Sequence, residues 1–132
     1  MEEKDKLVKE NLIDDCIFCK IIKGEIPADI VYENDMVIGF KDINPVAKFH
    51  IVVIPKKHIE SLENLDIKED AKYIVEIHKA IQEITRNFKV EKDGYRIVIN
   101  IAKNAGQEVK HIHYHIIAGE KLRKYEIIFL RG

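Results

Sequence analysis

Histidines and large apolar residues alternate without interruption from position 111 to position 116, and a second isoleucine follows at 117. Successive side chains of a β-strand point to opposite faces of the sheet, so every second residue shares a face. The alternation therefore predicts a strand that covers a core with one face and carries a row of imidazoles on the other. The imidazole face has His111, His113 and His115, and the apolar face has Ile112, Tyr114 and Ile116.

Four further segments have the composition of strands. Asn34-Asp35 between the first two favours a tight turn, so these two form a predicted hairpin. The third segment is a nearly continuous apolar run that Pro55 ends, which is typical of a strand buried on both faces. These segments are residues 30–32, 36–40, 50–54 and 95–101.

A long helix is predicted to begin at Asp66, because Asp66 with Glu69 three residues later is a variant of the capping box. Apolar residues then recur at helical spacing with charged residues between them, which indicates one buried face. His78 lies on this stripe or beside it and is interpreted as a packing residue. The predicted stripe consists of Ile67, Ala71, Ile74, His78, Ile81 and Phe88.

The order of these elements predicts an α+β fold, an antiparallel sheet of about five strands with one long helix packed on it. Short connections between neighbouring strands favour antiparallel pairing. A short helix over residues 16–23, ended by Gly24, precedes the first strand. We divide the chain into a charged N-terminal extension (1–15), one domain (16–118) and a C-terminal tail (119–132), in which residues 125–130 form a final strand or pack as an apolar tail.

Charge and composition narrow the range of functions. The chain of 132 residues has 22 basic and 23 acidic residues and a formal net charge of −1, which gives no electrostatic case for binding nucleic acid or a membrane. The charged residues 1–6 are not followed by the apolar segment that a signal peptide has, and no apolar run reaches the length of a bilayer span. We therefore expect a cytoplasmic protein.

The chain has two cysteines, Cys16 and Cys19, separated by two residues. In an intracellular protein this spacing is typical of half a zinc site or of a redox pair rather than of a structural disulfide. Two small buried residues with no chemical role are the alternative.

Four interpretations of the histidine row are open. The first is a strand whose exposed face carries histidines by chance, which the fourth histidine at His50 in a buried strand disfavours. The second is a metal site, although no acidic residue lies within the motif and three-histidine catalytic sites normally use more than one strand. The third is acid–base chemistry on a small substrate. The fourth is nucleophilic catalysis by one imidazole that its neighbours orient.

Nucleophilic catalysis on phosphorus suits these residues best. An imidazole with an ordinary pKa of about 6.5 is mostly neutral at pH 7, and a carbonyl bound to one ring nitrogen leaves the lone pair on the other. The loop of residues 104–107 directly before the row contains Gly106, whose backbone can approach a phosphate closely, and its consecutive amides could bind an anion. Asn100 is close enough in sequence to donate another hydrogen bond. The pattern therefore favours phosphate ester or phosphoramidate chemistry.

The alternation of histidine and apolar residues at 111–117 resembles the signature of the histidine triad (HIT) superfamily. Further segments, in the same order, are similar to the histidine-triad nucleotide-binding proteins, and the resemblance covers about residues 16 to 118. These segments are Cys16-Ile17-Phe18-Cys19-Lys20-Ile21-Ile22, Glu25-Ile26-Pro27, Asp42-Ile43-Asn44-Pro45, His50-Ile51-Val52-Val53-Ile54-Pro55-Lys56-Lys57-His58-Ile59, Gly94-Tyr95-Arg96-Ile97-Val98-Ile99-Asn100 and Gly106-Gln107-Glu108-Val109.

The resemblance implies a HIT-like fold and a purine nucleoside phosphoramidate hydrolase that forms a nucleotidyl-histidine intermediate. It implies His113 as the nucleophile, His115 and His111 beside it, His50 as support from the neighbouring strand, and Asp42 as the acceptor for the ribose hydroxyls. It also implies a base pocket and a phosphate site. The base pocket would use Phe18, Ile21, Phe40 and Ile43, and the phosphate site Asn100, Gly106, Gln107 and Val109.

The resemblance further implies a structural zinc ion and a homodimer whose sheet continues across the interface. The zinc ligands would be Cys16, Cys19, His58 and His111. Position 108 is Glu, where the best-known members have Ser, and their tryptophan-containing C-terminal tail is absent, so the leaving group is not implied. A dinucleoside polyphosphate hydrolase is one alternative, and a nucleotide-binding or interaction module with incidental turnover is another.

Overall fold

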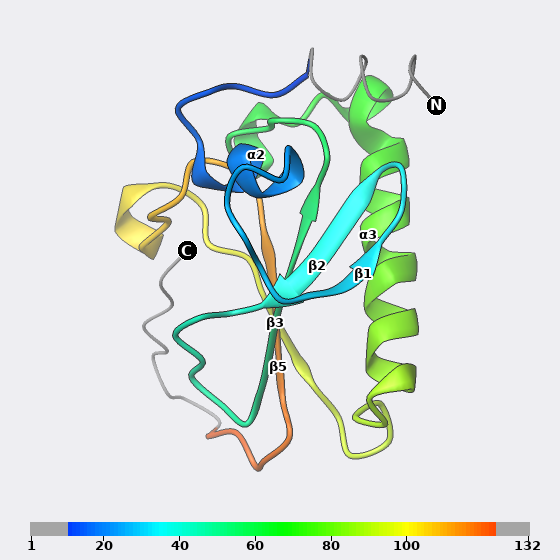
Figure 1. Ribbon diagram of the computed structural model, residues 1–132. Helices are drawn as coiled ribbons and strands as arrows, with labels where there is room; N and C mark the ends of the chain where they lie inside the picture. The colour runs from blue at the N-terminus through cyan, green and yellow to red at the C-terminus, as the bar shows by residue number, and fades with distance from the viewer. Residues whose placement is uncertain (1–10, 124–132) are drawn as a thin grey trace.

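The computed structural model describes residues 11–123 as one five-stranded antiparallel sheet with a helix on each face (Figure 1). The strand order β1-β2-β3-β5-β4 and the long helix confirm the predicted α+β fold. None of the helices in this part of the chain is long and apolar enough to cross a membrane. The strands are β1 (Ile30–Glu33), β2 (Val37–Lys41), β3 (Phe49–Pro55), β4 (Arg96–Val98) and β5 (Tyr114–Ala118), and the helices are α2 (Ile17–Ile22), α3 (Ile67–Asn87) and the short 3₁₀ turns η1 (Leu62–Asn64) and η2 (Lys103–Ala105).

The hairpin of β1 and β2 turns at Asn34, as the sequence predicts. Its side-chain Oδ1 accepts hydrogen bonds from the main-chain N–H groups of Met36 and Val37 at 2.8 and 2.9 Å, and its own N–H donates to the Val37 carbonyl oxygen. A short amide side chain that satisfies the turn's backbone is the reason Asn favours such positions.

Helix α3 begins at the predicted cap residue, Asp66, but Asp70 rather than Glu69 completes the capping box. The Oδ1 of Asp66 accepts from the N–H groups of Lys68 and Glu69, both at 3.0 Å. The reciprocal bond, which the capping box assigns to Glu69, is made instead by buried Asp70, whose Oδ2 accepts from the Asp66 N–H at 2.9 Å. The other oxygen of Asp70 lies 2.6 Å from the Lys57 Nζ, so the helix start is tied to the turn after β3.

The predicted buried face of α3 is partly wrong. Ile67 is 74% exposed, and Ala71 and His78 are also exposed, although the ring of His78 still contacts the edge of Tyr114. The helix carries apolar residues on more than one side, so helical periodicity alone does not select the side that faces the sheet. The residues that α3 buries are Asp70, Ile77, Ala80, Ile81, Ile84 and Thr85.

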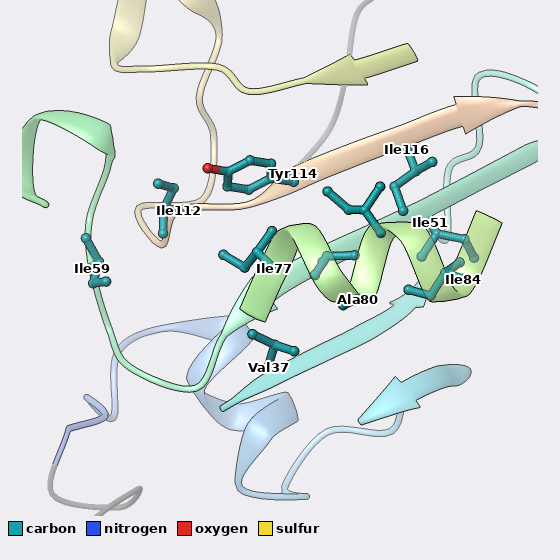
Figure 2. Packing of buried hydrophobic residues seen from close by; sticks show 11 residues of the cluster. Val37, Ile51, Ile59, Ile77, Ala80, Ile84, Ile112, Tyr114 and Ile116 are labelled. Atoms are coloured by element: carbon teal, nitrogen blue, oxygen red, sulfur yellow. The ribbon is translucent and has the colours of Figure 1, made fainter. Parts of the chain in front are cut away.

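Strand alternation divides the core into two layers. The layer between α3 and the sheet includes Ile77 and Ile84 of the helix and Ile51, Tyr114 and Ile116 of the strands (Figure 2). The helix approaches closely at Gly39, where a Cβ atom would lie 3.0 Å from the Cδ1 of Ile84. The layer on the other face packs α2 against alternate residues of β2 and β3, namely Ile38, Phe40, Val52 and Ile54.

Two predicted strands are longer than the observed ones. The segment predicted at 95–101 pairs only over β4, and the histidine strand is regular only from Tyr114, so residues 111–113 precede it. The ladder does not extend to the residues before Tyr114, where the main-chain N–H of Ile112 donates to the Ile59 carbonyl oxygen at 2.7 Å and Pro55 at the end of β3 has no N–H to offer. The predicted segment at 125–130 lies outside the described residues.

Candidate active site and metal centre

The three histidines of the row share one face, as the alternation predicts. This face is the α2 side of the sheet, and all three histidines are buried. The ring of Phe18, on α2, packs edge-on against His111 and His113 with centroid separations of 5.9 and 5.1 Å. The rings of His113 and His115 are 5.0 Å apart. Their apolar neighbours Ile112, Tyr114 and Ile116 face α3, so burial of one face fixes the orientation of the other.

His113 is held in one tautomer by the main chain. Its Nδ1 lies 2.7 Å from the carbonyl oxygen of His111, and a carbonyl only accepts, so Nδ1 carries the hydrogen. Nε2 of the neutral ring then bears the lone pair. This is the arrangement that a nucleophilic imidazole requires.

His50 and His115 form a directional chain of hydrogen bonds. The Val46 N–H donates to the His50 Nδ1 at 3.1 Å, which leaves the hydrogen of the neutral ring on Nε2. That Nε2 lies 2.9 Å from the His115 Nδ1, so His115 accepts there and carries its own hydrogen on Nε2. The His115 Nε2 is buried and has no hydrogen-bond partner within the described residues. It is therefore a donor available to a bound molecule.

Burial keeps these two rings neutral. Desolvation, with the nearby His113 and His50, lowers the pKa of His115 to about 3. Desolvation also lowers the pKa of His50, against the opposing effect of the Asp42 carboxylate. A neutral His115 at ordinary pH acts as a hydrogen-bond donor rather than as a cation.

Asp42 is turned toward the histidines in this structure. Its Oδ2 lies 3.3 Å from the His50 Nε2 and 3.8 Å from the His115 Nδ1, and its Oδ1 accepts from the Asn44 N–H at 2.8 Å. These three side chains are close enough to be considered as metal ligands. Because the two imidazoles are joined by a direct hydrogen bond, we assign the group to a hydrogen-bond network.

A second cluster joins Cys16, Cys19, His58 and His111, whose candidate ligand atoms all lie within 4.8 Å of one another. The His111 Nδ1 is 3.5 Å from both sulphur atoms, and the His58 Nδ1 is 3.4 Å from the Cys19 Sγ. We call this cluster the Cys/His centre. Cys16 is also the N-cap of α2, since its Sγ accepts from the Cys19 N–H at 3.4 Å.

The donor set of the Cys/His centre fits a tetrahedral zinc ion. With Zn–S near 2.3 Å and Zn–N near 2.0 Å, tetrahedral geometry gives S···N separations of about 3.5 Å. The Nε2 of His111 lies 2.9 Å from the Pro55 carbonyl oxygen, so Nε2 holds the hydrogen and the Nδ1 lone pair faces the sulphurs. The hydrogen bond from Cys19 lowers the pKa of the Cys16 thiol, whereas the same bond and burial raise that of Cys19.

Residues 11–13 pack over this centre, although the sequence places them in the extension. The Asn11 carbonyl oxygen accepts from the His58 N–H at 2.9 Å, and the Ile13 backbone hydrogen-bonds to Cys19. Leu12 is buried in the same layer as both cysteines. Within the mostly charged residues 1–15, the apolar pair Leu12-Ile13 is the sequence signal of these contacts.

Most of the residues expected in the base pocket lie together. Phe18 and Phe40 are buried with ring centroids 5.6 Å apart, and Ile21 packs against the same layer, as does Val109, which the resemblance assigns to the phosphate site. Ile43 is 90% exposed and is not part of this buried layer. Asn100 is half-buried. Nucleotide binding by these residues remains a prediction.

The loop before the histidine row is braced internally. The N–H groups of Gly106 and Gln107 donate to the carbonyl oxygens of Lys103 and Ala102, each at 3.1 Å. The Gln107 side chain accepts from the Ala102 N–H at 2.9 Å and donates to the Glu60 carbonyl at 2.7 Å. The main-chain N–H groups of Gly106 and Gln107, two of the four residues that the resemblance assigns to phosphate, thus bond within the loop here, and the phosphate role of these residues remains a prediction.

Sequence reasoning missed the main-chain partners that fix the imidazoles. These are the Val46 N–H on His50 and the Pro55 carbonyl on His111. Both are backbone groups, so residue type carries no direct signal of them. The sequence pattern marks Pro55 only as the end of a strand.

Comparison with known proteins agrees with this geometry. The HIT domain family matches residues 23–122. A histidine triad protein from Clostridium difficile superposes with a TM-score of 0.83 at 49% identity, over 86% of this chain and 98% of that chain. A HIT family hydrolase from Clostridium thermocellum superposes with a TM-score of 0.82 at 39% identity, over 88% of this chain and 99% of that chain.

Among curated proteins, the purine nucleoside phosphoramidase of Escherichia coli (strain K12) is 36% identical over 111 residues, which is 84% of this chain and 92% of that protein. The matched family spans most of the chain, and the buried histidine row lies within the matched residues. The chain belongs to the HIT domain family.

Proposed function

We propose that this protein is a hydrolase that cleaves the bond between the α-phosphorus of a purine nucleoside monophosphate and an amine. The observation that carries the proposal is the tautomer of His113, whose Nδ1 lies 2.7 Å from the His111 carbonyl oxygen and whose Nε2 bears a lone pair. The names of two similar proteins, a HIT family hydrolase and a purine nucleoside phosphoramidase, support the same class of reaction.

In the first step, the Nε2 of His113 attacks the α-phosphorus and the bond from phosphorus to the leaving amine breaks. The leaving nitrogen takes a proton from the solvent and departs as the amine, and the nucleotide is left as a nucleotidyl-histidine. The Nε2–H of His115 is the donor best placed to hold a phosphoryl oxygen, because His115 is the neighbour of His113 in the row and its Nε2 is otherwise unpartnered among the described residues.

In the second step, water attacks the same phosphorus and gives up a proton to the solvent, and the bond to the His113 Nε2 breaks, which releases the nucleoside monophosphate. The ring regains its starting tautomer because the His111 carbonyl oxygen keeps the hydrogen on Nδ1. Phe18 and Phe40 supply an apolar wall suited to a purine ring.

We also propose a structural zinc ion at the Cys/His centre. The support is the donor set, two thiols and two imidazoles with S···N separations of 3.4 to 3.5 Å, and the orientation of His111 by Pro55. Zinc bound by four protein ligands has no open position, so its contribution is to fix the fold around it rather than to activate water.

A homodimer through β4 is the quaternary structure that we propose. β4 ends the strand order, and Ile97 within β4 and Tyr95 just before it are each 37% exposed. A strand edge with unpaired backbone groups and apolar side chains is a template for pairing with a second copy. Light scattering on the purified protein, with Ile97→Lys as the disrupting variant, tests this.

Incubation with adenosine phosphoramidate tests the hydrolase. We expect release of adenosine monophosphate, and we expect intact-mass spectrometry of a rapidly quenched reaction to show a nucleotidyl adduct. His113→Ala should lose both, while His78→Ala, an exposed histidine on α3, should retain both. Wild-type turnover by the His113 variant would refute the mechanism. Faster turnover of diadenosine polyphosphates than of phosphoramidates would refute the substrate class.

A further inference from the structure

His111 takes part in two arrangements through different atoms. Its side chain belongs to the Cys/His centre, where its Nδ1 is 3.5 Å from the sulphurs of Cys16 and Cys19. Its main-chain carbonyl oxygen holds the Nδ1–H of His113 at 2.7 Å. One residue therefore links the thiols to the group that fixes the tautomer of the nucleophile.

Phe18 provides a second connection between the same two places. It lies in sequence between Cys16 and Cys19, within the first turns of α2, and it is buried. Its ring contacts the edge of His111 and, more closely, that of His113, at a centroid separation of 5.1 Å. Any rotation of α2 about its N-terminal cap at Cys16 moves this ring against the nucleophile.

From these contacts we propose that Cys16 and Cys19 are positioning residues for catalysis, which act on His113 through the His111 carbonyl and the Phe18 ring. The state of the Cys/His centre then sets the orientation and tautomer of the nucleophile as well as the stability of the fold. This inference rests on the proposed function, because it assigns His113 the role of nucleophile.

The physical basis is the small tolerance of an attacking group for misplacement. Within the part of the chain that the structure describes, the His111 ring is fixed by the two sulphurs on one side and by the Pro55 carbonyl on the other. Without the sulphur contacts the ring loses one of its two restraints, and the position of the His111 carbonyl is left to the Pro55 bond and to the bond from the Ile112 N–H of the same peptide to the Ile59 carbonyl. A misplacement of about 1 Å at a reacting atom costs on the order of 10²-fold in rate.

The test compares Cys16→Ser/Cys19→Ser with the wild type and with Ile77→Ala. Ile77 is buried in the layer on the other face of the sheet, so its variant is destabilised without touching the site. We expect the serine variant to lose at least about tenfold in kcat on adenosine phosphoramidate with KM within about twofold. Ring ¹⁵N shifts of His113 should show a mixture of tautomers in the serine variant and a single tautomer in the wild type and in Ile77→Ala.

Unchanged kcat and an unchanged His113 tautomer in a folded serine variant would overturn the proposal and leave the cysteines with a purely structural role. If the serine variant does not fold, the same shifts are compared in zinc-loaded and chelator-treated wild type, and equal spectra overturn it. If the wild type hydrolyses no phosphoramidate, the proposed function fails, while the ¹⁵N comparison still decides whether the centre controls His113.

Discussion

The Nε2 of His50 lies 2.9 Å from the Nδ1 of His115, although the two residues are 65 positions apart in sequence. The β3–β5 ladder explains this contact, because His50 pairs with Ile117 and Val52 with His115, so the two histidines are diagonal neighbours on one face. Through this bond and the Val46 N–H, a backbone group outside the row determines which nitrogen of His115 can donate.

The first prediction concerns this chain of hydrogen bonds. His50→Ala removes the group that keeps the hydrogen of His115 on Nε2. We therefore expect kcat to fall by about 10²-fold, which is the order of the rate loss when one positioned hydrogen-bond donor is removed. His115→Ala should cost a similar factor, and the double variant little more than either, because both changes remove the same donor. Steady-state kinetics of the three variants measure these losses. A loss of kcat in the double variant equal to the product of the two single losses would contradict the shared donor.

The second prediction concerns stability against pH. His115 has a folded pKa of about 3 against 6.5 for the free group, so the unfolded chain binds a proton in this interval and the folded chain does not. Stability should therefore fall as pH decreases from about 6.5 toward 3, by at most about 1.4 kcal/mol per pH unit from this group. Above pH 6.5 this contribution is constant.

Urea denaturation at several pH values between 4.5 and 7.5 measures this slope. His115→Asn removes the titrating group, whereas the other acid-sensitive groups remain, so the difference between the two slopes isolates His115. Identical slopes in the wild type and His115→Asn would rule out a depressed pKa at this position.

The third prediction concerns the metal. We expect elemental analysis to find one zinc per chain and chelation to lower the Tm by about 10 °C, which corresponds to about 2.7 kcal/mol for a ligand present at a hundred times its Kd. Cys16→Ser/Cys19→Ser should already have the lower Tm and respond little to the chelator. A wild-type Tm that does not change on chelation would contradict the zinc site.

The fourth prediction separates the two sides of α3. Ile77 is fully buried, so Ile77→Ala should destabilise the fold by about 2–5 kcal/mol through lost contacts and a residual cavity. Ile67→Ala, at a position that is 74% exposed, should change stability by about 0.5 kcal/mol or less. Equal losses from the two variants in urea denaturation would indicate that the orientation of the helix is different.

The sequence by itself determined the elements and much of the site. Alternation at 111–116 assigned the imidazoles to one face, because extended chain has a period of two whatever its neighbours are. The Asn34 turn and the Asp66 cap were also predictable, since each depends on hydrogen bonds within a few residues. The resemblance named the four residues that the structure brings together as the Cys/His centre.

Only the tertiary structure decided which side of α3 is buried and which nitrogen of each histidine carries a hydrogen. The first depends on the shape of the sheet beneath the helix, and the second on backbone groups such as the Val46 N–H and the His111 carbonyl. Backbone groups are the same at almost every position of a chain, so no residue pattern reveals them. Folding makes three similar imidazoles different by bringing each one to a different backbone or side-chain partner.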